Sequence, residues 1–275
     1  MSKPIAIQGI RGSFHHEVVK HYFNGSDDVI ECMSFDSAVD SLLTGQADDI
    51  VMALENSIAG SILPNYALID KYDLKIVGEY FLDIQHSLMA IDGQSIEDIK
   101  EVHSHPMALL QCKEFLKTYP HIKLVEAKDT ADVARQISEE KILGIAAIAS
   151  KNAAHMFGLK VLAESIQTIK HNETRFVIVK RDSSKDDNPE LNKASLKFIL
   201  DHKRGSLATI LNVMSDCKLN LTKIQSLPKI DTPWKYAFFV DVTFDAYNDY
   251  AKAKSIITLM ADDFKILGEY KNARQ

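Results

Sequence analysis

The stretch His171-Asn172-Glu173-Thr174-Arg175-Phe176 runs directly into the apolar residues Val177-Ile178-Val179. Such an apolar run is typical of a buried strand, and open α/β sheets present side chains to ligands where their strands meet a crevice. Amide, hydroxyl and guanidinium groups therefore stand at a candidate binding site. From these residues alone, a surface turn that leads into a strand is an equally good interpretation.

Length and composition indicate a globular protein with more than one domain. The chain has 275 residues, of which 46% are hydrophobic and 25% charged, so it can bury a large core. The net charge of -6 argues against nucleic-acid binding and against electrostatic attachment to a membrane. There is no leader in which a basic region precedes an apolar one, and no apolar run of bilayer-spanning length, so we expect a cytoplasmic protein.

A glycine-punctuated turn, Gly9-Ile10-Arg11-Gly12-Ser13-Phe14, follows a short apolar strand and opens a helix that ends near Phe23. Glycine allows close backbone approach, and the free N–H groups at a helix start attract an anion. The turn lacks the lysine of a phosphate loop and the three glycines of a dinucleotide-binding motif. It is a candidate anion site, with a structural turn as the alternative.

The residues Glu55-Asn56-Ser57 follow the apolar strand predicted at Ile50–Leu54. A carboxylate, an amide and a hydroxyl at the carboxyl end of a strand lie where α/β sheets bind ligands. A loop in which Asn56 or Ser57 caps a helix is an equally good interpretation of the same residues.

Ser104-His105-Pro106 stand just before a predicted helix, because proline suits the first helical turn. A helix start also favours an anion. His103 and His105 have no third ligand at a recognisable spacing, so we predict no metal site. The cysteines are too widely spaced for a metal motif or a disulfide framework; they are Cys32, Cys112 and Cys217.

The rest of the pattern predicts two α/β lobes followed by a separate module. Predicted strands alternate with predicted helices, which is typical of a mostly parallel sheet covered by helices. These strands lie at 74–77, 86–91, 123–126 and 143–147. Residues 78–80 are the predicted crossing between the lobes. The last 80 or so residues follow β-α-β-β-α-β order, the ferredoxin-like plan, and so small a module often hides a sheet edge against a partner.

Several of these stretches occur in the same order in one enzyme family. The sequence resembles prephenate dehydratase at Gly9–Phe14, Glu55–Gly60, Ser104–Pro106 with Gln111-Cys112, and Asn172–Phe176. The C-terminal module resembles the regulatory ACT domain that follows the catalytic domain in that family, including the segment from Trp234 to Asp241. The resemblance covers essentially the whole chain.

The resemblance implies an α/β catalytic domain at 1–181, with two lobes like those of type II periplasmic binding proteins. The lobes are residues 1–78 with 168–181, and residues 79–167; a linker at 182–193 and an ACT domain at 194–275 follow. The implied reaction converts prephenate to phenylpyruvate, water and carbon dioxide in phenylalanine synthesis, without a cofactor. Feedback by phenylalanine and a homodimer or homotetramer held by the ACT domain are also implied.

The resemblance also implies roles for single residues. Thr174 contacts the leaving hydroxyl as a donor or as one link in a relay, and Arg175 holds a substrate carboxylate. Glu55 stores a proton if burial raises its pKa, or else caps nearby N–H groups. His105 orients the site or caps a helix. The implied substrate-binding residues are Gly12, Ser13, Asn56, Ser57, Ser104, Asn172 and Phe176, with Phe176 packed under Arg175.

The implied effector site and several departures complete the prediction. Phenylalanine is expected at Gly205, Ser206, Leu207, Asn220 and Leu221. The chain departs from the family pattern at His15, Ala53, Met107 and Gln225-Ser226-Leu227-Pro228, the last of which replaces Glu-Ser-Arg-Pro. Two alternatives therefore stay open: a non-catalytic two-lobed sensor, and an active dehydratase that no longer responds to phenylalanine.

Overall fold

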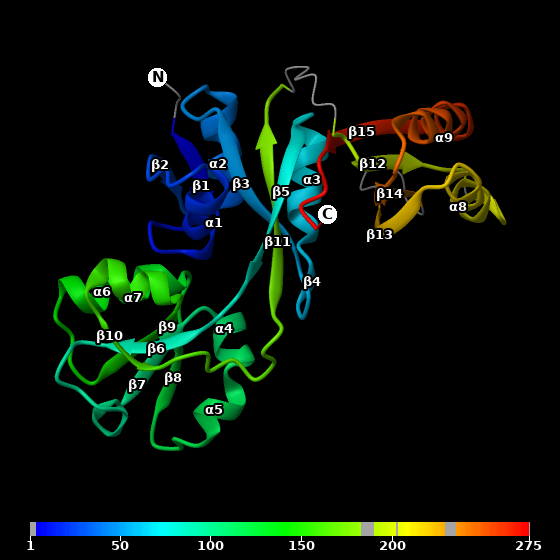
Figure 1. Cartoon of the computed structure of the whole chain (residues 1–275). Helices are drawn as coiled ribbons and strands as arrows, with labels where there is room; N and C mark the ends of the chain where they lie inside the picture. The colour runs from blue at the N-terminus through cyan, green and yellow to red at the C-terminus, as the bar shows by residue number, and fades with distance from the viewer. Residues whose placement is uncertain (1–3, 183–189, 202, 229–234, 275) are drawn as a thin grey trace. The chain divides into compact units, whose positions relative to one another are not determined.

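The computed structural model of the chain describes residues 4–182, 190–201, 203–228 and 235–274. Its strands form three sheets of six, five and four strands (Figure 1). Trp234 and residues 183–189, which make up most of the predicted linker, lie outside the described residues. Within the described part, no helix has the length and apolar character needed to cross a membrane.

The first sheet has the strand order β2-β1-β3-β11-β5, with β4 beside β3, and β1 lies parallel to both β2 and β3. Its strands are β1 (Ile5–Gln8), β2 (Val29–Cys32), β3 (Asp49–Asn56), β4 (Gly60–Ser61), β5 (Lys75–Asp83) and β11 (Glu173–Lys180). Its helices are α1 (Phe14–Tyr22), α2 (Phe35–Leu43) and α3 (Leu63–Lys71). The apolar part of β3 is fully buried, as expected for an inner strand.

The second sheet has the order β10-β6-β9-β7-β8, with β7 parallel to its two neighbours and β6 antiparallel to its own. Its strands are β6 (Ser87–Ala90), β7 (Glu101–Ser104), β8 (Lys123–Glu126), β9 (Ile145–Ala149) and β10 (Lys160–Ala163), the last not predicted. Its helices are η1 (Ile96–Asp98), α4 (Pro106–Gln111), α5 (Lys113–Lys117), α6 (Thr130–Glu139) and α7 (Lys151–Phe157).

Alternation along β9 shows that helices cover both faces of this second sheet. Ile148 packs in one apolar cluster with Leu109 of α4 and Leu116 of α5. Ala147 packs in another cluster with residues of α6 and α7. Because successive side chains of a strand point to opposite faces, the two clusters lie on opposite sides. The predicted α/β fold class is confirmed.

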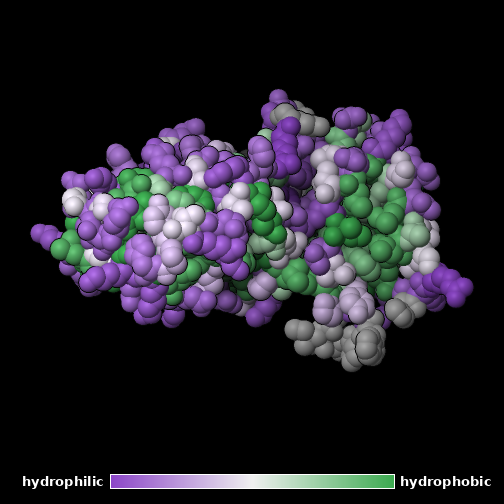
Figure 2. All heavy atoms as spheres, turned by 90° about the horizontal axis from the view of Figure 1, so that it is seen from below, coloured by the Kyte–Doolittle hydropathy of each residue, from purple (hydrophilic) through white to green (hydrophobic). Residues whose placement is uncertain are grey.

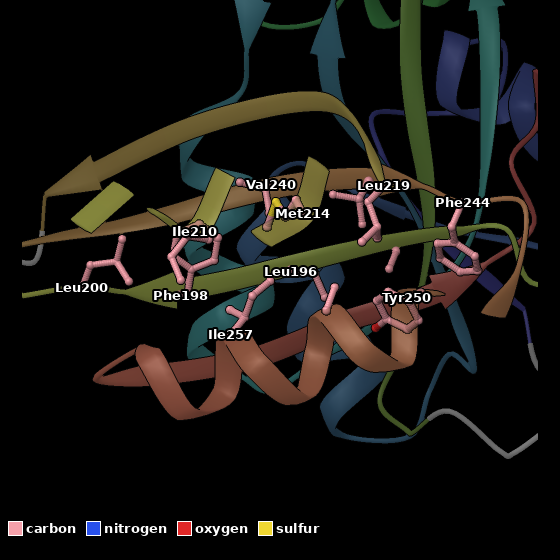
Figure 3. Close-up of a cluster of buried hydrophobic side chains, with 13 residues drawn as sticks. Leu196, Phe198, Leu200, Ile210, Met214, Leu219, Val240, Phe244, Tyr250 and Ile257 are labelled. Atoms are coloured by element: carbon pink, nitrogen blue, oxygen red, sulfur yellow. The ribbon is translucent and has the colours of Figure 1, made fainter. Parts of the chain in front are cut away.

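The third sheet is antiparallel, with the order β13-β14-β12-β15. Its elements are β12 (Lys193–Ile199), α8 (Ser206–Asp216), β13 (Asn220–Pro228), β14 (Tyr236–Thr243), α9 (Tyr247–Met260) and β15 (Asp263–Tyr270). Leu196, Phe198 and Val240 pack against Ile210 of α8 and Ile257 of α9 (Figure 3). The predicted ferredoxin-like order is confirmed.

The opposite face of the third sheet carries charged side chains. Lys193 donates to both carboxylate oxygens of Glu79 in β5, at 2.9 and 2.8 Å, and Lys197 pairs with Asp70 of α3 at 2.8 Å. The side chains of Lys193 and Glu79 are only 6% and 0% exposed. A buried ion pair of this kind is costly to break because either partner alone is an uncompensated charge. These contacts hold α3 and β5 against the third sheet.

The ion pair at Glu79 explains why one strand is longer than predicted. The sequence predicts a strand at 74–77 that ends before Gly78-Glu79-Tyr80, but these residues lie inside β5, which continues to Asp83. Because Glu79 must stay opposite Lys193, the strand is held in place through this point. The second sheet begins only at Ser87.

The chain divides into two compact units, residues 1–60 with 81–176 and residues 61–80 with 177–275. Residues 61–80 contain α3 and most of β5, so the contacts of Asp70 and Glu79 account for their place with the third sheet. The predicted domain and lobe boundaries come from the family resemblance and not from contacts within the structure, and they stay predictions.

His15 of α1 is a buried histidine that packs among aromatic rings. Its ring packs edge-on to Phe35 and Phe176, with centroid distances of 5.5 and 5.0 Å. Its Nε2 atom has no hydrogen-bond partner among the described residues. Burial alone lowers the pKa of His15 from 6.5 to about 3, because a charged ring is poorly solvated there.

We expect His15 to weaken the fold in acid. Below pH 6.5 the unfolded chain binds a proton that the folded chain excludes, so stability falls as the pH drops from 6.5 towards 3. Well below pH 6.5 this loss amounts to about 1.4 kcal/mol per pH unit. His15→Phe removes it, so urea unfolding as a function of pH should show a shallower slope. His155→Phe, at an exposed position of α7, is the control and should keep the parent slope; equal slopes for both variants would contradict the assignment.

Candidate active site

The end of β3 and the start of β11 bring together residues that are far apart in the sequence. Asn56 closes β3, and its side-chain nitrogen donates to Asn172 Oδ1 at 2.7 Å and to Thr174 Oγ1 at 2.9 Å. Ser57 N–H donates to the carbonyl of Glu173 at 2.8 Å, and Glu173 N–H donates back to Ser57 Oγ at 3.0 Å. Four predicted site positions therefore share one small region; they are Asn56, Ser57, Asn172 and Thr174.

The orientation of the Asn56 amide follows from its neighbours. Its Oδ1 accepts the backbone N–H groups of Ile58 and Ala59, at 3.0 and 2.8 Å. Because a backbone N–H can only donate, the amide oxygen must face these groups and the nitrogen must face Thr174 and Asn172. The amide thus caps a turn and not a helix, since α3 begins later, at Leu63.

The same logic fixes the next amides. Asn172 Oδ1 accepts from Asn56, so Asn172 Nδ2 donates, and it does so to Gln111 Oε1 at 3.0 Å. Gln111 Oε1 also lies 2.9 Å from His86 Nε2. An amide oxygen only accepts, so His86 carries its proton on Nε2. Thr174, Asn56, Asn172, Gln111 and His86 therefore form one directed chain of hydrogen bonds.

The Thr174 hydroxyl is prepared to donate. Its oxygen accepts the Asn56 N–H, which leaves its own hydrogen available for an acceptor other than Asn56. The residue is 7% exposed, so water competes weakly for that hydrogen. A hydroxyl held in this way can stabilise negative charge that develops on a nearby oxygen.

Three other predicted residues are occupied by contacts within the protein. The Gly12 carbonyl accepts from Ser150 Oγ at 2.8 Å, and at its φ of +88° a Cβ would lie 3.3 Å from Ala153 Cα. Ser13 Oγ caps α1 by accepting the His16 N–H at 3.3 Å. Ser104 is fully buried, and its hydroxyl donates to a carbonyl of β9 at 2.6 Å. Their substrate-binding roles stay predictions.

The remaining predicted residues differ in burial and in what they contact. Glu55 is half-buried in β3, and His105 is exposed, with Nδ1 capping α4 by accepting the Met107 N–H at 3.2 Å. Arg175 and Phe176 are both buried in β11. The prediction that Phe176 packs under Arg175 is wrong, because neighbours in a strand point to opposite faces and Phe176 packs on His15.

Sequence reasoning did not identify Gln111, His86 or Asp129 as site residues. Asp129 caps α6 through Oδ1, which accepts the Asp132 N–H at 2.8 Å, and burial raises the pKa of its carboxyl. Its Oδ2 lies so close to Gly9 that a Cβ there would be 2.7 Å away, with Ser13 beside it. The Asp-Thr pair before a helical pattern is a signal for a cap, but only the fold places it beside the glycine turn.

A small hollow of about 110 Å³ in the third sheet's unit lies at some of the predicted effector residues, whose role stays a prediction. Ser206 and Leu207 at the start of α8 line it, together with residues that follow β12 and residues of β14. Gly205 precedes them with a φ of +89°. Asn220 and Leu221 begin β13 and are absent from the described lining residues, so the structure gathers only part of the predicted set.

A larger hollow of about 590 Å³ lies between α9 and β15 and is lined by three lysines. Each lysine is paired with a carboxylate: Lys75 with Asp73, Lys254 with Glu269, and Lys265 with Asp70 and Asp73. Compensated charges at a wide, shallow surface give no reason to place the chemistry there. In the part of the chain that is described, no three His, Cys, Asp or Glu side chains are arranged to hold a metal ion.

The family model described as prephenate dehydratase matches residues 5–184. The chain belongs to the prephenate dehydratase family. It is 33% identical over 276 residues to arogenate dehydratase/prephenate dehydratase 2 of Arabidopsis thaliana, which covers 97% of this chain and 72% of that protein. An arogenate dehydratase of Petunia hybrida is 37% identical over 224 residues, or 82% of this chain and 56% of its own length. The chain thus spans between about half and three quarters of these relatives.

Solved structures agree with this membership of the prephenate dehydratase family. Prephenate dehydratase from Arthrobacter aurescens in complex with L-Phe has a TM-score of 0.88 and 25% identity, covering 98% of this chain and 90% of that one. A protein titled GqqA, a novel type of quorum quenching acylase, has a TM-score of 0.89 and 27% identity, covering 99% and 100%. The predicted family resemblance is confirmed.

The variant Asn56→Asp tests the directed chain of hydrogen bonds from Thr174 to His86. An aspartate still accepts from Ile58 and Ala59 but cannot donate, so it faces the oxygens of Asn172 and Thr174 with a second acceptor. We expect a loss of about 1–3 kcal/mol in the free energy of unfolding, measured in urea near neutral pH. The control is Asn220→Asp, the same change at an exposed position, which should stay within about 0.5 kcal/mol of the parent. Equal losses of stability in the two variants would count against the directed chain of hydrogen bonds.

Proposed function

We propose that this chain is a dehydratase that converts prephenate to phenylpyruvate, water and carbon dioxide. The observation that carries the proposal is the Thr174 hydroxyl, whose oxygen is occupied by Asn56 and whose hydrogen is left to donate. It stands at the junction of β3 and β11, the kind of position where open sheets bind ligands. Membership of a family of lyases supports the same reaction.

The reaction asks little of the protein beyond holding charge and helping one group to leave. The ring carboxylate departs as carbon dioxide, and the electron pair of its bond moves into the ring. The 4-hydroxyl takes the pair of its own carbon–oxygen bond and needs one proton to leave as water. The Thr174 O–H stabilises the charge that grows on this oxygen, although its pKa is too high for it to be a simple acid.

Two carboxyl groups are candidates for supplying the proton. Glu55 lies next to Asn56 at the end of β3 and is half-buried. Asp129 has a raised pKa because of burial, so it holds a proton at higher pH than an ordinary aspartate. In this proposal Arg175 and His105 hold and orient the substrate carboxylates, since a guanidinium can bind a carboxylate with two parallel hydrogen bonds.

The third sheet and its helices are the proposed regulatory ACT domain. A related dehydratase structure contains L-Phe, which supports phenylalanine as an effector of this chain. Asp201 and Lys203, which pair with each other, also line the hollow beside Ser206 and Leu207. An amino acid bound there would offer its ammonium group to Asp201 and its carboxylate to Lys203. Binding against the backbone at Gly205 is the proposed mode.

Self-association through the same module is part of the proposal. β13 is an edge strand of nine residues, and its Ile224 side chain is 41% exposed. Edge strands with exposed apolar residues tend to be covered by a partner. Figure 2 shows hydrophobic residues gathered on part of the face that it presents. The exposed large hydrophobic residues of this module include Tyr236, Tyr247, Ile256, Leu259 and Met260. A homodimer or homotetramer in the cytoplasm is the proposed state.

A second candidate function comes from the structural likeness to the acylase GqqA. Arogenate is a further candidate substrate, because the Arabidopsis relative is named for both dehydratase activities. One assay separates these possibilities: purified protein is given prephenate, arogenate or an N-acylated amine, and each product is measured. Phenylpyruvate from prephenate supports the main proposal, and release of the acyl group without any turnover of prephenate would overturn it.

Thr174→Val should lower kcat strongly, because valine keeps the shape of threonine and removes the hydroxyl. Loss of one donor to a developing oxyanion costs on the order of 10²–10³-fold in kcat. Thr174→Ser keeps the hydroxyl and should recover most of the rate. Phenylpyruvate formation from prephenate provides the measurement, and circular dichroism controls for folding. A valine variant with near-parent kcat would remove Thr174 from the mechanism.

Gly205→Ala should weaken phenylalanine binding, because the added Cβ occupies the place where the ligand meets the backbone. Gly93→Ala is a matched control: both glycines have a φ of +89°, and neither Cβ would meet an atom within 4 Å. Backbone strain is therefore similar in the two variants. Calorimetry with phenylalanine should show binding lost only in Gly205→Ala. Undiminished binding in Gly205→Ala would move the effector site elsewhere.

A further inference from the structure

His86 stands at the far end of the chain of hydrogen bonds from Thr174. It lies between β5 and β6, is 3% exposed, and meets Gln111 Oε1 through Nε2 at 2.9 Å. Among the described residues, no hydrogen bond joins His86 to Thr174 or Asn56. Its effect on the site must therefore pass through Gln111 and Asn172.

We propose that His86 is a positioning residue for the dehydratase reaction. Its Nε2–H group donates to Gln111 and so fixes which way the Gln111 and Asn172 amides face. Through Asn56, these amides set the direction in which the Thr174 hydroxyl donates. The inference rests on the proposed function, because the hydroxyl it aims is the one assigned to the leaving group. It concerns a residue that lies outside the sequence motifs of the predicted site.

The chain of hydrogen bonds from Thr174 to His86 is fixed at both ends, and the donors and acceptors set by one end must match those set by the other. At one end the backbone N–H groups of Ile58 and Ala59 turn the Asn56 oxygen towards themselves. At the other end the Nε2–H of His86 turns the Gln111 oxygen towards itself. An amide flipped at any link would face donor with donor or acceptor with acceptor.

Gln111 is the link that most needs this second anchor. Its Oε1 receives two donors, from Asn172 at 3.0 Å and from His86 at 2.9 Å. Without His86, a flipped Gln111 amide would place its own N–H groups against Asn172 Nδ2. Asn172 would then turn as well, and Asn56 would lose an acceptor beside Thr174.

The surroundings of His86 hold its ring and its tautomer. The ring packs edge-on to Phe14 at 5.6 Å, and the His86 backbone N–H donates to Gln167 Oε1 at 3.0 Å. Its Nδ1 atom is buried and has no partner among the described residues, so a proton there would lack an acceptor. Burial also lowers the pKa of His86, which keeps the ring neutral. The Nε2–H form is the one that these contacts favour.

Three variants separate positioning from bulk packing. His86→Gln places an amide nitrogen near the position of Nε2, because both atoms lie four bonds from Cα. His86→Asn places its nitrogen near the position of Nδ1, one bond short of Gln111. His86→Phe keeps the ring and removes the donor. The glutamine variant should therefore restore what the other two lose.

The expected kinetic result is a loss in kcat of about 10- to 100-fold for His86→Asn and His86→Phe, because a misaimed catalytic group loses rate on this scale. KM for prephenate should stay within about threefold, because His86 does not hold the substrate. His86→Gln should keep most of the parent kcat. His155→Asn, at an exposed site, controls for the change itself. Equal kcat for the Gln and Asn variants, each shown to be folded by circular dichroism, would overturn the proposal.

A second measurement does not depend on turnover. Nitrogen NMR of the His86 ring in the parent protein should show the proton on Nε2, and Gln111→Leu should change that signal. Turnover with the proton on Nδ1 overturns the role of His86 while leaving the dehydratase intact. The Nε2–H form without any turnover of prephenate overturns the proposed function, and the positioning role with it.

Discussion

The site depends on the pairing of β3 with β11. These strands lie side by side although more than 100 residues separate them, and the pairing continues past the end of β3, where Ser57 and Glu173 exchange two hydrogen bonds. This extension brings the Asn56 amide to 2.9 Å from the Thr174 hydroxyl. A slip of one residue would turn every side chain of the strand to the other face, so register and chemistry are set together.

The second constraint is the donor-to-acceptor direction of the hydrogen bonds. It starts from backbone N–H groups, which can only donate. The N–H groups of Ile58 and Ala59 fix the Asn56 amide, and each later partner inherits its role as donor or acceptor. The result is a buried Thr174 hydroxyl whose oxygen accepts from Asn56. Such preorganised dipoles do not have to reorient as the reaction proceeds, which is where their catalytic effect comes from.

Lysine side chains of the C-terminal module bind α3, β5 and the residue Ser61, which lie between β3 and β11 in the sequence. Lys193 and Lys197 hold β5 and α3, and Lys223 of β13 donates to Ser61 Oγ at 2.8 Å. Ser61 lies five residues after Asn56, so the segment that carries the amide leads directly into residues bound by the module. The third sheet therefore uses one face for its own apolar core and the other for α3 and β5.

The amino-acid sequence by itself determined much of the order of elements, because apolar periodicity and capping residues are local. It predicted α1, α2, the ferredoxin-like module and the family, whose motifs include Thr174. It did not predict where β5 ends, since a buried ion pair at Glu79 holds the strand past Gly78. Nor did it select His86 or Asp129, and it named Gln111 only within a family motif, because nothing local distinguishes an ordinary polar residue from one that belongs to a site. Only the tertiary structure decided which donors meet which acceptors, since strand pairing brings distant residues together.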